Sequence, residues 1–167
     1  MHDTNEIVIN TSPLIALVAA LGDLEILQEL YQNVFVTFEV SEEIHAGGRE
    51  GFAIEPFERA TWLTRFSTPL EISPYLQNSL DRGEASVIQL ALNENIRTVC
   101  IDETVGRRIA KLSGLSVTGS IGILLRAKKE GMELSLHDAI RNMKEKGIWL
   151  SEKVINFALR EAGEMPR

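Results

Sequence analysis

Cysteine is almost absent from this chain, since Cys100 is the single one among 167 residues. The chain can therefore form no internal disulfide and no cysteine metal cluster. Cys100 follows Val99 in an apolar run, where a free cysteine usually behaves as a small buried hydrophobe. We expect a structural thiol in a protein of the reducing cytoplasm.

Positive charge is also scarce, with 17 Lys and Arg against 24 Asp and Glu and a formal net charge of −7. This balance argues against a protein whose whole surface binds nucleic acid or anionic membrane, although a local basic rim stays possible. The longest apolar run, from Pro13 to Leu21, is too short to span a bilayer. Asp3 and Glu6 precede it and no Lys or Arg does, which does not suit a signal peptide. We therefore expect no membrane segment.

Short apolar segments alternate with amphipathic ones. Strands are predicted at residues 6–9, 34–36, 62–63, 97–101 and 115–118. Helices are predicted at 14–20, after Asp23, and at 40–46, 84–93, 103–112, 121–130, 136–146 and 151–162. This order predicts a three-layer α/β fold with a central parallel sheet of four to five strands and helices on both faces. We expect one domain over residues 1–167, with additional C-terminal helices at about 136–162.

Local signals add two expectations. Ser12 before Pro13 predicts a helix start, with the hydroxyl as cap and proline at the first helical position. Residues 47–61 are the least regular part of the chain, and with Arg49 and Arg59 we expect a loop that faces a substrate or partner.

Two polar residues follow predicted strands. Asn10 ends the first strand and Asp102 ends a later one. Open α/β sheets place their chemistry at the carboxyl ends of strands, so these two side chains are candidates for a site. The alternative is that each is only a helix cap or turn residue.

Two glutamates complete the candidate set. Glu43 lies three residues after Val40, which places it on or beside an apolar helix face, whereas Glu39 and Glu42 are expected toward solvent. Glu84 heads the apolar stripe of its helix. The alternatives are a charged helix rim for Glu43 and a first-turn acid that complements the helix dipole for Glu84.

Crowded carboxylates raise one another's pKa unless a cation neutralises them. A hard divalent ion such as Mg²⁺ or Mn²⁺ accepts oxygen ligands, keeps several waters and can activate one of them. No Walker loop, GxGxxG motif or histidine pair offers another chemistry, and His2, His45 and His137 are scattered and expected at the surface.

Five segments of the sequence together resemble the PIN domain (PilT N-terminus) family of nucleases, most closely a VapC-like subgroup of unknown function. They run over residues 8–15, 40–44, 81–88, 101–110 and 117–124. The resemblance implies a Mg²⁺- or Mn²⁺-dependent ribonuclease that cleaves single-stranded RNA, commonly the toxin of a toxin–antitoxin pair.

The resemblance also assigns roles. Glu43, Glu84 and Asp102 fall on the family's acidic positions and are the expected catalytic residues, and Asn10, Glu84 and Asp102 are the expected metal ligands. Expected supporting or phosphate-binding residues are Ser12, Arg107, Thr118 and Ser120, and an expected basic rim for RNA comprises Lys111, Arg126, Lys128 and Lys129.

The chain departs from the family pattern at Asn10, where the family has aspartate. An amide oxygen can coordinate a hard cation but brings no charge, so we expect weaker metal binding and reduced or absent nuclease activity. Two alternatives follow. One is a catalytically inactive PIN-fold binding or regulatory module; the other, a phosphoryl-accepting receiver domain, is disfavoured because Asn10-Thr11-Ser12 offers no aspartate.

Partners are expected to be RNA, an antitoxin protein encoded elsewhere, and a second copy of the chain. The apolar helix from Pro13 to Leu21 and the helix after it are the surface that we expect a homodimer to bury.

Overall fold

A five-stranded parallel sheet forms the centre of the molecule. The computed structural model describes residues 5–165, and all four strand pairings of the sheet are parallel. The strand order is β3 (Thr64–Arg65), β2 (Asn33–Val36), β1 (Glu6–Ile9), β4 (Thr98–Cys100) and β5 (Ser116–Thr118). The central strand β1 is fully buried at Ile7, Val8 and Ile9, as expected for a sheet covered on both faces.

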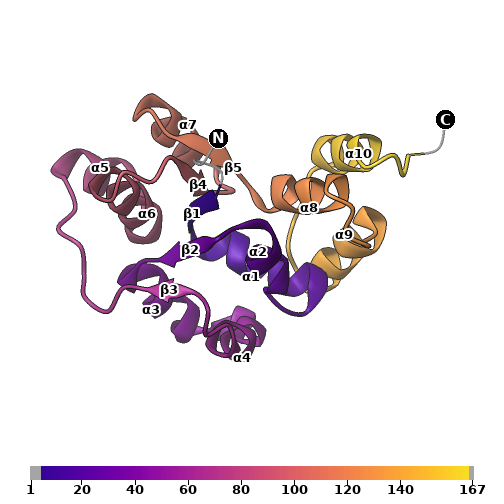
Figure 1. The fold of residues 1–167 in the computed structure, drawn as a ribbon, viewed down its shortest axis with the longest axis horizontal. Helices are drawn as coiled ribbons and strands as arrows, with labels where there is room; N and C mark the ends of the chain where they lie inside the picture. Colours follow the sequence, from indigo (N-terminus) through magenta and orange to yellow (C-terminus); the bar gives the residue numbers. More distant parts are fainter. Residues whose placement is uncertain (1–4, 166–167) are drawn as a thin grey trace.

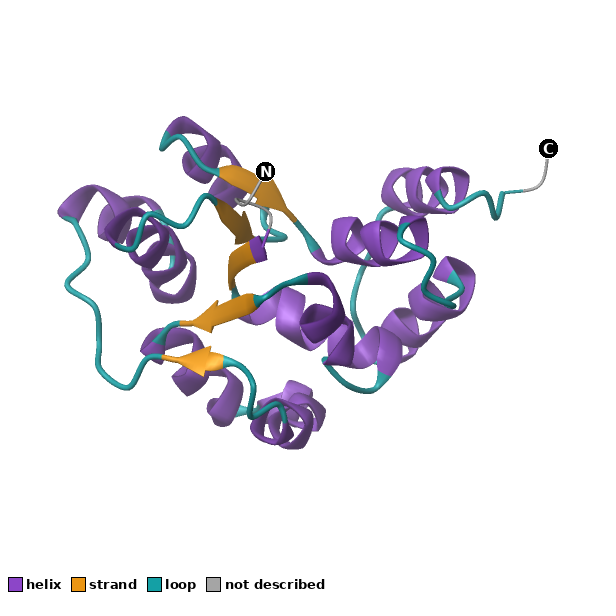
Figure 2. Ribbon diagram, viewed as in Figure 1, coloured by secondary structure: helices purple, strands orange, loops and turns teal. Residues whose placement is uncertain are grey.

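Helices connect these strands and cover the sheet. They are α1 (Thr11–Leu21), α2 (Glu25–Leu30), α3 (Phe38–Ala46), the 3-10 helix η2 (Gly48–Ala53), α4 (Ile54–Arg59), α5 (Pro74–Ser79), α6 (Arg82–Asn93), α7 (Thr104–Leu112), α8 (Ser120–Lys129), α9 (Leu136–Glu145) and α10 (Glu152–Glu161). Figures 1 and 2 show α1 and α2 on one side of the sheet and α5 and α6 on the other. The predicted three-layer α/β class is therefore confirmed.

Three local predictions were wrong. Residues 47–61 are not a loop, because η2 and α4 occupy most of them and bury Phe57. The edge strand β3 lies at Thr64–Arg65 rather than at 62–63. Helix α5 was not predicted, although Ser73 caps it by accepting from the Leu76 amide and Pro74 lies in its first turn.

The start of α1 also differs from its prediction. The helix begins at Thr11, one residue before Ser12, and Asn10 takes the N-cap position. Ser12 is thus inside the first turn and exposed, so its hydroxyl does not cap the helix. The Ser-Pro signal that fails here is the one that works at Ser73-Pro74.

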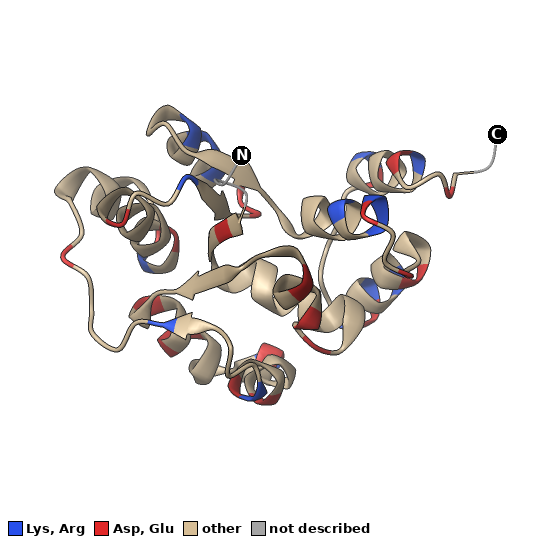
Figure 3. Cartoon of the chain, in the orientation of Figure 1, with Lys and Arg blue, Asp and Glu red and all other residues tan. Residues whose placement is uncertain are grey.

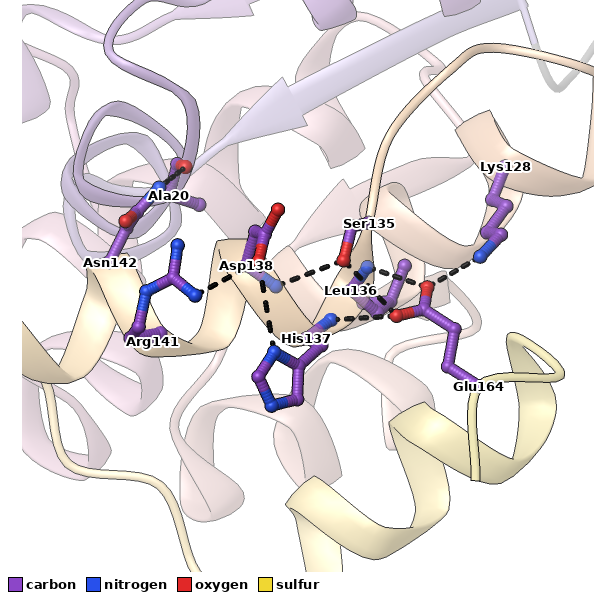
Figure 4. Close-up of polar contacts among 9 residues, drawn as sticks. All are labelled: Ala20, Lys128, Ser135, Leu136, His137, Asp138, Arg141, Asn142 and Glu164. Carbon is purple, nitrogen blue, oxygen red and sulfur yellow. Dashed lines mark hydrogen bonds and ion pairs between the residues drawn. The ribbon is translucent and has the colours of Figure 1, made fainter. Parts of the chain in front are cut away.

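Helix α1 is covered within its own chain. Residues 13–20 are all buried, and α9 packs along the helix. The Asn142 side chain of α9 donates a hydrogen bond to the Ala20 carbonyl at 2.9 Å (Figure 4). A homodimer would therefore need a surface other than α1. Over residues 5–165, no helix has the length and apolar character needed to cross a membrane.

The carboxylate of Glu164 ties the end of the chain to α8 and α9. It accepts hydrogen bonds from the amides of Leu136 at 2.7 Å and His137 at 3.0 Å, and it pairs with Lys128 of α8 (Figure 4). Partial burial raises the pKa of Glu164, but the bonds from Lys128, His137 and Leu136 outweigh it and lower the pKa to about 2. Charge-assisted bonds of this kind are the stronger ones in proteins.

Glu164→Gln should destabilise the protein by about 1–2 kcal/mol at neutral pH, because the charge-assisted bonds are lost. Because the pKa of Glu164 is lower in the folded protein, its contribution to the free energy of unfolding is fully present above the unfolded value of 4.5. That contribution is lost as pH falls toward 2. Urea unfolding at pH 7 and pH 3 measures the difference. The exposed Glu161→Gln is the control, and equal losses in both variants would contradict the assignment.

Candidate functional site

Three polar positions meet at the carboxyl ends of neighbouring strands. Asn10 follows β1, Asp102 follows β4, and Thr118 ends β5 before Ser120 opens α8. The backbone N–H of Asn10 donates a hydrogen bond to the Cys100 carbonyl at 3.0 Å, which extends the β1–β4 pairing up to the site. This edge is where parallel α/β sheets bind their ligands.

The Asn10 side chain is not a helix cap. It is 3% exposed, and within residues 5–165 its Oδ1 accepts no hydrogen bond and its side chain makes no capping bond. A buried acceptor without a partner costs about 1–3 kcal/mol, so such atoms commonly mark a ligand site or another functional role. Asn10 therefore occupies the N-cap position of α1 without a capping hydrogen bond from its side chain.

Glu84 carries another buried side-chain atom without a partner; the others within residues 5–165 are Glu39 Oε1, Ser41 Oγ and Trp62 Nε1. Asp81 is the N-cap of α6 and accepts from the Glu84 amide at 2.9 Å, which fixes the first turn. The Glu84 side chain lies against α7, where a Cβ at Gly106 would be only 3.2 Å from its Oε2. Glu84 is 5% exposed, and its Oε2 accepts no bond from any described residue.

Burial is the main reason that the pKa of Glu84 rises from 4.5 to about 7, with the charges of Asp81 and Glu103 adding to it. The carboxylate is thus poorly compensated at neutral pH. A cation beside Oε2 would restore its ionised form.

Glu43 makes two close approaches, one to α1 and one to the first turn of α6. The Thr11 hydroxyl donates to Glu43 Oε1, which joins α1 to α3. The same oxygen lies so near Gly83 that a side chain there would displace it. The carboxylate of α3 therefore reaches the first turn of α6, and the exposed-rim alternative for Glu43 does not describe its position.

Asp102 is fixed by the start of α8. It accepts from the Ser120 amide at 2.7 Å and from the Ser120 hydroxyl at 2.9 Å. A Cβ at Gly119 would lie 2.6 Å from Asp102 Oδ1, so a glycine there allows the approach. Burial raises the pKa of Asp102, while Ser120 and Arg107 oppose that rise. Because Glu103 takes the N-cap position of α7, Asp102 is not that cap.

Two neighbouring cavities are lined by some of the predicted residues, whereas Asn10 and Glu43 are in neither lining. The larger, about 860 Å³, is lined by Asp102 together with Ser12, Arg107, Thr118 and Ser120. The smaller, about 460 Å³, is lined by Glu84 and Asp81. Glu103 lines both cavities, whereas Asp102 lines only the larger one.

Arg107 and two residues of the predicted basic rim already bind other groups of the protein. Arg107 Nη1 donates to the Ile101 carbonyl at 2.8 Å. Arg126 pairs with Glu130, and Lys128 pairs with Glu164. Lys111 and Lys129 are exposed, and Figure 3 shows the Lys and Arg residues of α7 and α8.

Sequence reasoning missed several residues around the site. Glu39, expected toward solvent, is 1% exposed and accepts from the Leu70 amide at 2.8 Å, so that expectation was wrong. Thr11 and Asp81 carried no prediction of their own, yet Thr11 donates to Glu43 and the charge of Asp81 raises the pKa of Glu84. These contacts join segments far apart in the chain.

The donor atoms suit a hard cation. Asn10 Oδ1 and Glu84 Oε2 are buried oxygens without partners among residues 5–165, and carboxylate and amide oxygens are the ligands that Mg²⁺ and Mn²⁺ prefer. Across that described part of the chain, no group of three His, Cys, Asp or Glu side chains converges as a metal-holding set. Asn10 and Glu84 are therefore candidate ligands for such a cation.

A family model described as a PIN domain matches residues 6–164. This chain belongs to the PIN domain family. Comparison with curated proteins returned no match, and comparison with solved structures returned none. The PIN domain has a nuclease-type fold, generally binds nucleic acid and generally uses divalent metals.

Without added metal, Glu84→Gln should stabilise this PIN domain at pH 8 by about 1–3 kcal/mol, because the charged form is disfavoured in the fold. Because the pKa of Glu84 is higher in the folded protein, its contribution to the free energy of unfolding is fully present below the unfolded value of 4.5. That contribution is lost as pH rises through about 7. The gain should therefore vanish at pH 4. Chemical unfolding in EDTA measures it, with the exposed Glu29→Gln as control. A Glu84→Gln protein less stable than wild type at pH 8 would refute the assignment.

Proposed function

We propose that this PIN domain is a Mg²⁺- or Mn²⁺-dependent endonuclease that cleaves single-stranded RNA. One observation carries the proposal: Asn10 Oδ1 and Glu84 Oε2 are buried, lack partners within the described residues and belong to the polar positions near the carboxyl edge of the sheet. Folding leaves such oxygens unpaired only at an energetic cost, which a bound cation would offset.

Asn10, Glu84 and Asp102 are the proposed ligands of the cation. When bound, such an ion lowers the pKa of a coordinated water and stabilises charge on a phosphate. Ser120 orients Asp102 through two hydrogen bonds, so that carboxylate is fixed before any ligand arrives. Glu43 is held by Thr11 beside the first turn of α6, where it supports Glu84 or orients water.

The larger cavity supplies the proposed phosphate contacts. Arg107 lines it and uses Nη1 for the Ile101 carbonyl, which leaves further guanidinium donors for a phosphate oxygen. Ser12 and Thr118 line the same cavity and add hydroxyl groups. Phosphate contacts of this kind position a nucleic acid without reading its sequence.

A second candidate function is a PIN-fold binding or regulatory module that does not cleave RNA. The observation that favours it is Asn10 itself, because an amide replaces a charged ligand where the described chain offers no three-acid group. Such a module would have the same fold and cavities but would not cleave RNA.

We further propose a cytoplasmic setting, an antitoxin partner encoded elsewhere and a homodimer as the working assembly. Cys100 is fully buried and unpaired, which is compatible with a reducing compartment. The homodimer would use a surface other than α1.

Mn²⁺-dependent cleavage of a labelled single-stranded RNA should fall on the order of 100-fold or more in Glu84→Gln, because a ligand charge is lost. Gel analysis of the fragments measures it. The control Glu29→Gln should cleave at the wild-type rate. Absence of cleavage by the wild-type protein at saturating Mn²⁺ would instead support the binding module.

Asn10→Asp should tighten Mg²⁺ binding about 10-fold, because it adds a charge to the ligand set. Isothermal titration with Mg²⁺ measures the affinity, and the cleavage assay measures whether the rate rises with it. Unchanged Mg²⁺ affinity would show that Asn10 does not face the cation.

A further inference from the structure

The larger cavity has a second wall that the proposed chemistry does not use. It is built by the segment after α9 and by α10, and includes Trp149, Val154 and Phe157. Trp149 follows Gly147, whose φ of 87° turns the chain out of α9. The rest of the lining includes Asp102, Arg107 and the other proposed phosphate contacts.

These three side chains are unusually open to solvent. Trp149 is 82% exposed, Phe157 51% and Val154 38%. They line one cavity, whereas the other exposed large hydrophobic side chains in the described chain are distributed over α5, α6 and α7. Val154 and Phe157 are three residues apart on α10, so they lie on the same side of that helix.

The core does not account for this placement. A tryptophan left in water contributes little to folding, and apolar side chains gathered around a cavity commonly mark a binding site. The cavity, at about 860 Å³, falls within the range of sites for small ligands. Its walls combine an aromatic surface with Arg107 and hydroxyl groups, which suit a base and its phosphate, and they also carry the acids Glu50, Asp102 and Glu103.

We propose that this cavity is a nucleobase subsite in which an unpaired base of the substrate stacks on Trp149, with Phe157 and Val154 beside it and the adjoining phosphate near Arg107. The choice of a nucleic acid as the ligand of this subsite rests on the proposed function. A stacked base must be free of its duplex partner, so the subsite selects single strands over duplexes.

A nucleic acid fits the cavity better than a protein partner because both walls belong to one space. A peptide that covered only the apolar wall would leave the polar wall, with Asp102 and Arg107, without a function in binding. A strand that crosses the cavity uses the two walls at once, with its base on one and its phosphate on the other.

The test measures binding apart from cleavage. A fluorescently labelled single-stranded 8-nucleotide RNA is titrated with the full chain in Ca²⁺, and gels check that the RNA stays whole. Trp149→Ala should weaken binding about 10-fold, whereas Trp149→Phe should keep most of the affinity. An abasic strand of equal length should bind wild type as weakly as RNA binds Trp149→Ala.

Tyr75→Ala is the matched control, since Tyr75 is an aromatic residue on α5 that is 61% exposed and absent from the described linings of both cavities. It should bind like wild type. Equal affinity of wild type for the intact and abasic strands, no binding of either, or no effect of Trp149→Ala would overturn the proposal. So would a change in oligomeric state by sedimentation in Trp149→Ala, which would assign this wall to a protein interface.

The two proposals fail separately. Trp149-dependent binding without Mn²⁺-dependent cleavage would support the subsite and refute the nuclease. Cleavage that is lost in Glu84→Gln but unchanged in Trp149→Ala would support the nuclease and refute the subsite.

Discussion

Burial of acidic side chains beside the carboxyl edge of the sheet is the constraint on which the arrangement of the surrounding helices depends. Glu43, Glu84 and Asp102 each lie against a glycine of a neighbouring segment, so α6, α7 and the β5–α8 turn approach them closely. Close approach removes water, and burial then raises the pKa of Glu84 and Asp102. The fold therefore disfavours the ionised forms of Glu84 and Asp102, and a bound cation would favour them.

The C-terminal helices contribute to stability and to the binding surface at once. Helix α9 covers α1, whose apolar residues would otherwise face solvent, and Glu164 fixes the end of the chain to α8 and α9. The same segment carries Trp149 to the rim of the larger cavity. A change that loosens the Glu164 contacts would therefore also alter the wall on which we place the base.

Elements with strong local signals could be predicted from sequence, and contacts between distant segments could not. β1 and α6 were found because an apolar run and an amphipathic stripe specify them. Burial of Glu39 depends on the Leu70 amide, and the contact between Thr11 and Glu43 depends on how α1 meets α3. The candidate residues came from strand ends and a family resemblance; their hydrogen bonds and cavities required the packed fold.

The central position of β1 has a consequence for how the protein is made. Val8 pairs with Phe35 on one side and with Val99 on the other, so the first strand to leave the ribosome waits for a partner synthesised much later. Until α9 follows, nascent α1 lacks its cover and presents an apolar helix to chaperones and to other chains. The acidic edge is consequently assembled late in synthesis, after the ribosome has translated most of the message.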